Sequence, residues 1–228
     1  MIKIAILWDF DGVIIFTPHE EAWRLVGLRY GITDFSSDFY HKYVSGRPRY
    51  EGARAILEYF GLLRDLDSDS VSRIIHEFAE EKNKLYNELI SRGYYSINTS
   101  ALEFIESTKK YNNALFVHVL ASASRNVAKL ADNVSFRGRL LREFFDYNVS
   151  GSGDTKKEVF EKGLRLTSSA DCHIVIDDAP SGIRAALDLG LIPIGFRNLD
   201  LVNNGAVYVI KSFKETSPGT VVRLCRSR

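Results

Sequence analysis

The stretch that decides the fold is residues 2–12, which read IKIAILWDFDG. Its apolar run, broken only by Lys3, is typical of a strand buried on both faces of a parallel sheet. Asp9 and Asp11 follow at once, and residues two apart in extended backbone point the same way, about 6 to 7 Å apart. Gly12 then allows the chain to turn away. The sequence therefore predicts a buried strand with two carboxylates at its carboxyl end.

Two carboxylates at this spacing repel each other unless a cation lies beside them. A hard cation with oxygen ligands removes the repulsion, and a carboxylate next to such an ion can attack phosphorus. The alternative is a strand that simply ends in a polar turn, and the short motif alone does not separate the two interpretations. An EF-hand calcium loop is excluded, because Val13 stands where a third ligand is needed.

The composition is ordinary for a globular protein: 228 residues, 45% hydrophobic and 26% charged. This length suits one α/β domain, with or without an insertion. The net charge of +1 gives no electrostatic basis for binding nucleic acid or an anionic membrane. No run of about 18 apolar residues predicts a membrane span. We therefore expect neither nucleic acid nor a membrane as a partner. We also expect a monomer or weak homodimer.

The two cysteines, Cys172 and Cys225, have a spacing typical of neither a metal site nor a disulfide framework. Two cysteines without either kind of spacing therefore indicate a reducing, intracellular setting. The apolar run of residues 2–8 is broken by Asp9 too early for a secretory signal. We expect a cytoplasmic protein.

Residues 16–95 contain no strand-like run, and their periodicity is helical. One apolar stripe at helical spacing consists of Ala53, Ile56, Leu57 and Phe60. A longer stripe spans residues 71–89, and Lys82 lies on its apolar face. That lysine either extends its stem to reach water or is a cation aimed into a cleft. We predict an all-helical unit of residues 16–95, inserted into a core of residues 1–15 and 96–228.

Strands and helices alternate in the rest of the chain. Strand-like apolar runs occur at residues 115–121, 144–149, 173–176, 192–196 and 207–210. This alternation predicts an α/β fold with a doubly wound, Rossmann-like parallel sheet, and such sheets bind ligands beyond the carboxyl ends of their strands. His118 lies within the second strand, where a buried histidine with satisfied ring nitrogens is a better interpretation than a ligand.

Polar side chains with a chemical use follow several of these strands or open the helices between them. They are Asp9, Asp11, Ser122, Lys156, Asp177 and Asp178. Because the carboxyl ends of parallel strands meet at one edge, we expect these side chains to converge there. Acids, a hydroxyl and a lysine at one edge are poorly explained by separate coincidences.

These motifs resemble those of the haloacid dehalogenase (HAD) superfamily of phosphatases and phosphomutases. Its four motifs are matched by Asp9-Phe10-Asp11-Gly12-Val13, by Ser122, by a lysine of Thr155-Lys156-Lys157, and by Asp177-Asp178. In the third motif both Lys156 and Lys157 fit, and we prefer Lys156. The resemblance covers most of the chain and is strongest to the branch with a small helical cap, which includes β-phosphoglucomutase and phosphoglycolate phosphatase-like enzymes.

The resemblance implies that Asp9 attacks phosphorus and becomes an aspartyl phosphate, while Asp11 acts as general acid and then as general base. Ser122 and Lys156 would hold the phosphoryl oxygens. The implied activity is a phosphatase that hydrolyses a small phosphorylated metabolite. Two alternatives stay open: a phosphohexomutase, which passes the phosphoryl group to a second sugar hydroxyl, and a catalytically silent scaffold that only binds a partner or metabolite.

Mg²⁺ is the cofactor that the resemblance implies. Its ligands would be Asp9, the backbone carbonyl of Asp11, and Asp178, with Asp177 acting through water. The helical unit would be a cap that closes over the site. The residues expected to recognise the substrate are Arg49, Lys82, Ala123, Ser124 and Asn126.

Overall fold

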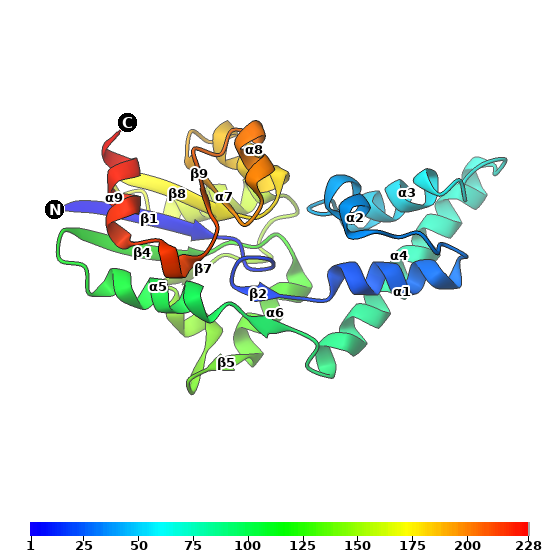
Figure 1. The fold of residues 1–228 in the computed structure, drawn as a ribbon, viewed down its shortest axis with the longest axis horizontal. Coiled ribbons are helices and arrows are strands. Elements are labelled where there is room, and N and C mark those ends of the chain that lie inside the picture. Colours follow the sequence, from blue (N-terminus) through cyan, green and yellow to red (C-terminus); the bar gives the residue numbers. More distant parts are fainter. Residues whose placement is uncertain (228) are drawn as a thin grey trace. The chain divides into compact units, whose positions relative to one another are not determined.

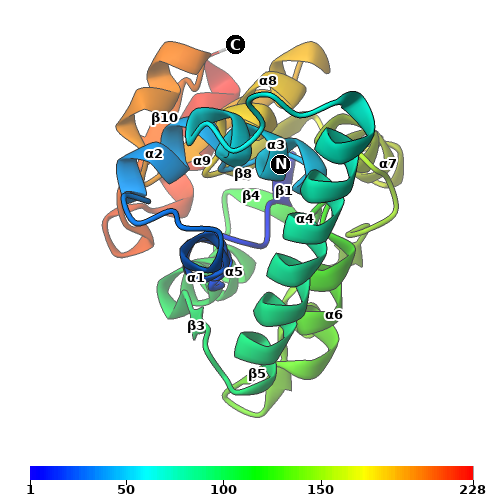
Figure 2. The same cartoon turned by 90° about the vertical axis from the view of Figure 1, so that its right-hand side faces the viewer.

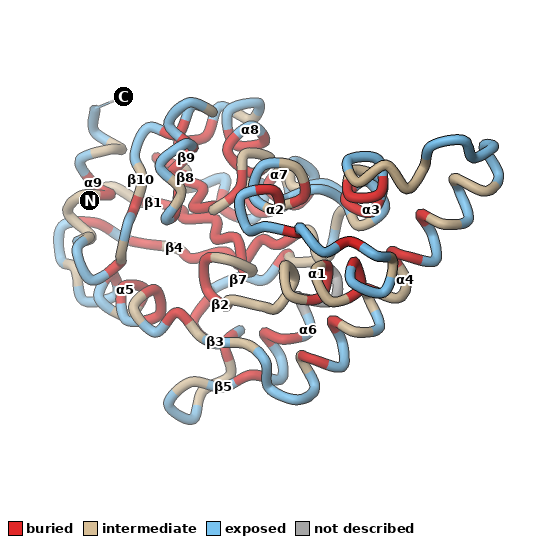
Figure 3. Tube along the Cα trace, turned by 45° about the vertical axis from the view of Figure 1, so that its right-hand side comes forward, coloured by how far each residue is buried: buried red, intermediate tan, exposed pale blue. Residues whose placement is uncertain are grey.

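A computed structural model of the chain describes residues 1–227, with only the backbone described at residues 125–128. The chain divides into two compact units (Figure 1). The α/β unit consists of Met1–Phe16 together with the chain from Ser96 onward, and the helical unit is Thr17–Tyr95. Each unit has its own buried residues, shown in red in Figure 3.

The α/β unit is built on a six-stranded sheet in which every neighbouring pair is parallel. In spatial order its strands are β10 (Tyr208–Ile210), β9 (Ile192–Phe196), β8 (Cys172–Asp177), β1 (Ile2–Trp8), β4 (Ala114–Leu120) and β7 (Tyr147–Asn148). The predicted parallel sheet is confirmed. β1 lies between β4 and β8, so the first acidic motif ends a central strand, as its unbroken apolar run predicts.

Helices cover both faces of this sheet. They are α5 (Thr99–Lys109), α6 (Arg125–Asn133), α7 (Lys156–Leu166), α8 (Pro180–Asp188) and α9 (Pro218–Arg226). On one face, Leu7 of β1 belongs to an apolar cluster with Phe160 of α7 and Ala186 of α8. On the other face, the ring of Trp8 packs against Phe104 of α5. Successive residues of β1 therefore point to opposite apolar layers.

Short elements complete the α/β unit. They are the hairpin of β5 (Ser135–Phe136) and β6 (Arg139–Leu140) and the 3-10 turns η1 (Leu141–Phe144), η2 (Leu199–Asn204) and η3 (Phe213–Glu215). The strand predicted at residues 144–149 is shorter than expected, because η1 occupies its first residue.

A buried hydrogen-bond chain joins β1, β4 and α5. Trp8 Nε1 donates to His118 Nδ1 at 3.0 Å, and His118 Nε2 lies 2.7 Å from Thr108 Oγ1. Burial lowers the pKa of His118 to about 3, with a small contribution from Lys109. The imidazole is therefore neutral, and the prediction of a satisfied core histidine is confirmed.

The helical unit consists of α1 (His19–Arg29), α2 (Ser37–Tyr43), α3 (Arg49–Tyr59) and α4 (Ser68–Ser91), the last running as one long helix (Figure 2). The predicted apolar stripes are confirmed, because Ile56 and Leu57 of α3 are buried in one cluster with Ile75 and Phe78 of α4. Asp67 caps α4 by accepting a hydrogen bond from the backbone of the first turn.

Two paired strands lie where the chain leaves and re-enters the α/β unit. β2 (Ile15–Phe16) pairs antiparallel with β3 (Ser96–Ile97), with Phe16 opposite Ser96. Asn98, just after β3, donates a side-chain hydrogen bond to the carbonyl of Val13 at 2.8 Å. The two connections to the helical unit are therefore tied together within the α/β unit.

A disulfide joins Cys172, the first residue of β8, to Cys225 of α9. The prediction from their spacing that these cysteines form no disulfide is therefore wrong. The two residues are 53 apart in sequence, and only the fold brings the start of β8 to the C-terminal helix. Within residues 1–227, no helix has both the length and the apolar character needed to span a membrane.

Candidate active site

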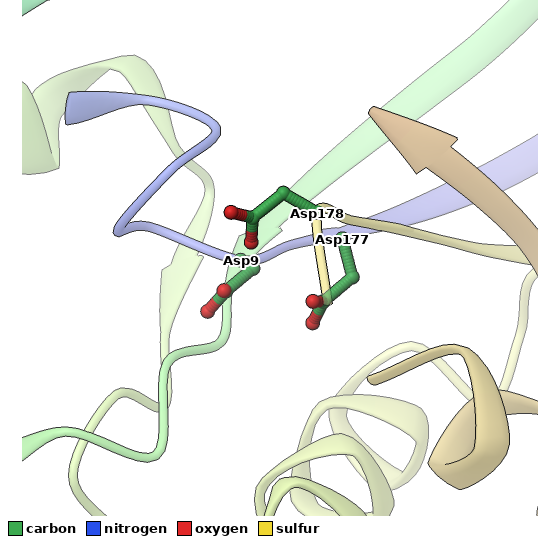
Figure 4. A group of neighbouring side chains, drawn as sticks. All are labelled: Asp9, Asp177 and Asp178. Carbon is green, nitrogen blue, oxygen red and sulfur yellow. The ribbon is translucent and has the colours of Figure 1, made fainter. Parts of the chain in front are cut away.

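Three acids meet at the carboxyl edge of the sheet. Carboxylate oxygens of Asp9, Asp177 and Asp178 lie within 4.8 Å of one another (Figure 4). The cause is the register of two neighbouring parallel strands: Trp8 of β1 lies opposite Ile176 of β8, and the Asp9 amide donates to the Ile176 carbonyl at 2.9 Å. The predicted convergence of the first and fourth motifs is therefore observed.

Lys156 lies between two of these acids. Its Nζ is 2.5 Å from Asp9 Oδ2 and 2.7 Å from Asp177 Oδ2. The lysine is the first residue of α7, where Thr155 and Glu158 form a capping box that fixes the start of the helix. Burial opposes its charge, but the two carboxylates outweigh burial and raise the pKa of Lys156 above its usual value. Lys157 is exposed, so the geometry favours Lys156.

Asp9 is almost fully buried, at 4% exposure, and burial raises its pKa to about 7 although Lys156 opposes the shift. Burial also raises the pKa of Asp178 well above its usual value, and the neighbouring acids add to the effect. Among the described residues, none offers a hydrogen bond to Asp9 Oδ1, which is buried. Three acids, one lysine and an unpaired carboxylate oxygen fit a divalent cation with oxygen ligands, such as Mg²⁺.

Two glycines allow the acids to come this close. Gly12 has a φ of +83°, and a Cβ there would lie 2.1 Å from Asp178 Oδ2. A Cβ at Gly182, in the first turn of α8, would lie 2.0 Å from Asp177 Oδ2. Any side chain at either position would therefore displace a carboxylate. The turn predicted at Gly12 is confirmed, and Gly182 was not expected to be part of the site.

Asp11 and the serine motif lie at the same edge of the α/β unit. Asp11 is half-buried and bridges to Ile15, and its carboxylate is not part of the three-acid cluster. Ser122 follows β4 and is buried; its amide donates to Ser150 Oγ at 3.1 Å, and its hydroxyl accepts from the Ser124 amide at 3.4 Å.

The other two residues of the serine motif are less fully described. Ala123, between the two serines, is partly exposed. Asn126 was also expected to bind substrate, and its side chain lies outside the described residues.

Lys82 lies in the helical unit and is buried, with 4% exposure. Its Nζ is 2.6 Å from His19 Nδ1 and about equally close to the centroids of two aromatic rings, 4.9 Å for Trp23 and 4.8 Å for Tyr86. The interpretation that this lysine extends to water is therefore wrong. His19 was not expected to take part, because nothing in the sequence pairs it with a residue on a distant helix.

Arg49, the first residue of α3, also lies in the helical unit and pairs with an acid. Its Nη2 is 3.3 Å from Glu80 Oε1, and its guanidinium lies 5.0 Å above the ring of Tyr50. The Tyr50 hydroxyl donates to the same oxygen of Glu80 at 2.7 Å. An anion that binds Arg49 must therefore compete with Glu80.

Solved structures of other proteins are similar to the whole chain. An archaeal β-phosphoglucomutase from the hyperthermophile Pyrococcus sp. strain ST 04 is 40% identical, with a TM-score of 0.84, over 99% of this chain and 100% of that chain. A β-phosphoglucomutase from Clostridium difficile is 25% identical, with a TM-score of 0.72, over 100% and 98% of the two chains. A HAD hydrolase of family IA, variant 3, from Entamoeba histolytica is 25% identical, with a TM-score of 0.70, over 97% and 99%. No protein-family model matches the chain.

Proposed function

The chain belongs to the haloacid dehalogenase superfamily, in the branch with a helical cap, and on this basis we propose that it is a Mg²⁺-dependent enzyme of phosphoryl transfer with Asp9 as its nucleophile. The observation that carries the proposal is the placement of Asp9: one carboxylate oxygen contacts Lys156, and the other is buried without a hydrogen-bond partner among the described residues. Most buried side-chain oxygens in proteins have a hydrogen-bond partner, and a bound ion is one explanation for an oxygen that has none.

In the proposed reaction Asp9 attacks the phosphorus of a phosphate ester, and the bond from phosphorus to the leaving oxygen breaks. Asp11 gives a proton to that oxygen. Lys156 and the Ser122 hydroxyl bind the phosphoryl oxygens and neutralise or share their charge. Mg²⁺, held by Asp9, Asp178 and the carbonyl of Asp11, with Asp177 behind them, would supply the remaining positive charge that a buried, ionised nucleophile needs.

We propose a sugar hydroxyl as the acceptor of the phosphoryl group, which makes the enzyme a phosphomutase. The 40% identity to a β-phosphoglucomutase over nearly the whole chain supports this choice. Arg49 and Lys82 of the helical unit suit a second phosphate. Arginine can form a bidentate contact with two phosphate oxygens, and lysine adds a point charge.

Hydrolysis is the second candidate, in which Asp11 deprotonates water instead of a sugar hydroxyl. One observation favours it: Glu80 already pairs with Arg49 and lowers the positive charge available to a second phosphate.

The test is a product assay. The protein is incubated with β-glucose 1-phosphate, Mg²⁺ and a trace of glucose 1,6-bisphosphate, and glucose 6-phosphate and inorganic phosphate are measured in the same sample. Excess glucose 6-phosphate supports the mutase, and excess inorganic phosphate supports the phosphatase. If neither forms, and p-nitrophenyl phosphate is also left intact, the proposal is wrong. Asp9→Asn is the inactive control for each reaction.

A further inference from the structure

Arg197 has an unusual backbone conformation at the edge of the sheet that carries the acids. It follows β9 directly and has a φ of +59°. The Asn198 amide donates to the Phe196 carbonyl at 2.7 Å, so Arg197 is the central residue of a three-residue turn. Such a turn with a positive φ is rare and strained for any residue other than glycine. Strain of this kind is common at functional sites.

The side chain of Arg197 lies over aromatic rings. Its guanidinium carbon is 4.6 Å from the ring centroid of Phe16 and 5.5 Å from that of Phe196. Phe16 is the last residue of β2, and the segment that joins β1 to β2 contains Asp9 and Asp11. Stacking holds a guanidinium by its face and leaves the N–H donors at its edge able to bind oxygen atoms.

No acid of residues 1–227 forms an ion pair with Arg197, and the residue is exposed. It also follows a strand that neighbours β8, the strand that ends in Asp177. Asp177 is opposite Gly195 in the register of β8 and β9. Arg197 is two residues beyond Gly195 and follows the carboxyl end of β9, at the same edge of the sheet as Asp177. A cation without an ion-pair partner among the described residues therefore lies at the sheet edge that carries the acids.

We propose that Arg197 is a further substrate-recognition residue, which binds phosphate or carboxylate oxygens of the substrate away from the phosphoryl group that Asp9 attacks. The inference rests on the proposed function. Ser122 and Lys156 are already assigned to the transferred phosphoryl group, whereas the guanidinium of Arg197 offers a planar pair of donors for a second anionic group. A glycine would adopt the same backbone without strain, so recognition by the side chain gives a reason for an arginine here.

The experiment measures binding without turnover, in the Asp9→Asn background with Mg²⁺, by calorimetry. The two probes are glucose 1,6-bisphosphate, which has a second phosphate, and p-nitrophenyl phosphate, which has none. Arg197→Gly removes the cation and relieves the strained turn. We expect it to raise the Kd for the bisphosphate about 10- to 100-fold, the effect of one lost charge-assisted contact, and to change the Kd for p-nitrophenyl phosphate less than about threefold. Arg197→Lys should give a Kd for the bisphosphate between those of the parent and of Arg197→Gly.

Arg137→Gly is the matched control. Arg137 also has a positive φ, +51°, and lies 4.8 Å above a phenylalanine ring, that of Phe136. Its guanidinium, however, is paired with Glu103 at 2.7 Å. The control should leave both dissociation constants unchanged.

Equal weakening of both probes by Arg197→Gly, or no weakening, overturns the inference, because Arg197 would then hold the loop or do nothing in binding. If neither probe binds the Asp9→Asn parent, both the inference and the proposed function fail. Binding to the parent that is indifferent to Arg197 overturns the inference alone.

Discussion

The ammonium nitrogen of Lys156 lies 2.5 Å from Oδ2 of Asp9. This contact stabilises the ionised carboxylate, yet burial still raises the pKa of Asp9 to about 7. One lysine is therefore too little positive charge to offset burial of the Asp9 carboxylate, which lies beside two further acids. The imbalance leads to the first two predictions below.

The first prediction concerns pH in the absence of divalent cations. The pKa of Asp9 is raised to about 7 in the folded protein and is about 4 in the unfolded chain. The folded protein therefore holds the proton more tightly, and its stability falls as the pH rises from about 4 to about 7. Asn is neutral throughout. Asp9→Asn should thus be more stable than the wild type at pH 8, and the difference should shrink as the pH approaches 4. Denaturant titrations of both proteins in EDTA at several pH values measure the difference in their free energies of unfolding. A difference that does not change with pH would contradict the raised pKa of Asp9.

The second prediction concerns Mg²⁺. A cation that binds only the folded protein stabilises it by about 2.7 kcal/mol at a free concentration one hundred times its Kd. We expect thermal melting to shift upward with Mg²⁺ and back with EDTA, and Asp178→Asn to reduce the shift. Asp188 is an exposed acid at the end of α8. Asp188→Asn is therefore the control and should show the same Mg²⁺-dependent shift as the wild type. A melting temperature that changes with neither Mg²⁺ nor EDTA would argue against a metal site.

The third prediction separates the two acids of the first motif. Asp9→Asn removes the nucleophile and should abolish turnover. Asp11→Asn keeps the nucleophile and the backbone carbonyl, so it should still respond to Mg²⁺ but react at least about 100-fold more slowly, the lower range for a lost acid-base group. Steady-state rates on the best substrate test this. More activity in Asp9→Asn than in Asp11→Asn would reverse the assigned roles.

The fourth prediction concerns the Arg49–Glu80 pair. Arg49→Ala should lower kcat/KM about 10- to 100-fold for a substrate with a second anionic group, and much less for acetyl phosphate. Glu80→Gln removes the competing acid and should lower KM for the same substrate. Arg54→Ala is the control, because Arg54 lies on the same helix and pairs with Glu58. Equal losses on both substrates would assign Arg49 to folding instead of recognition.

The sequence was sufficient to predict the parallel sheet and the meeting of Asp9 with Asp177 and Asp178. Both follow from local patterns: an unbroken apolar run means a buried strand, and parallel strands that are neighbours place their ends together. The register of β1 against β8 then fixes the spacing of the acids. Lys156 also follows from a local pattern, because its position at the start of a capped helix is encoded within four residues.

The remaining features depend on contacts between distant residues. The Cys172–Cys225 disulfide spans 53 residues, and the partner of Lys82 is His19, on another helix. Neither pair has a periodicity that could reveal it. The strained turn at Arg197 could not be predicted for a different reason. A positive φ at a residue other than glycine contradicts local backbone preference, so the sequence argues against such a turn.

The pairing of Phe16 with Ser96 has a consequence for how such a protein can change over evolutionary time. Because the exit and the return of the chain lie side by side, the α/β unit sets no requirement on the length of what is inserted between them. Insertions of other sizes can be exchanged at this point while the acids of β1 and β8 stay in register. The two short strands thus form a fixed attachment point, at which the helical unit can be replaced separately from the strands that carry the acids. A chimera that replaces residues 17–95 with a short loop should keep the α/β unit folded.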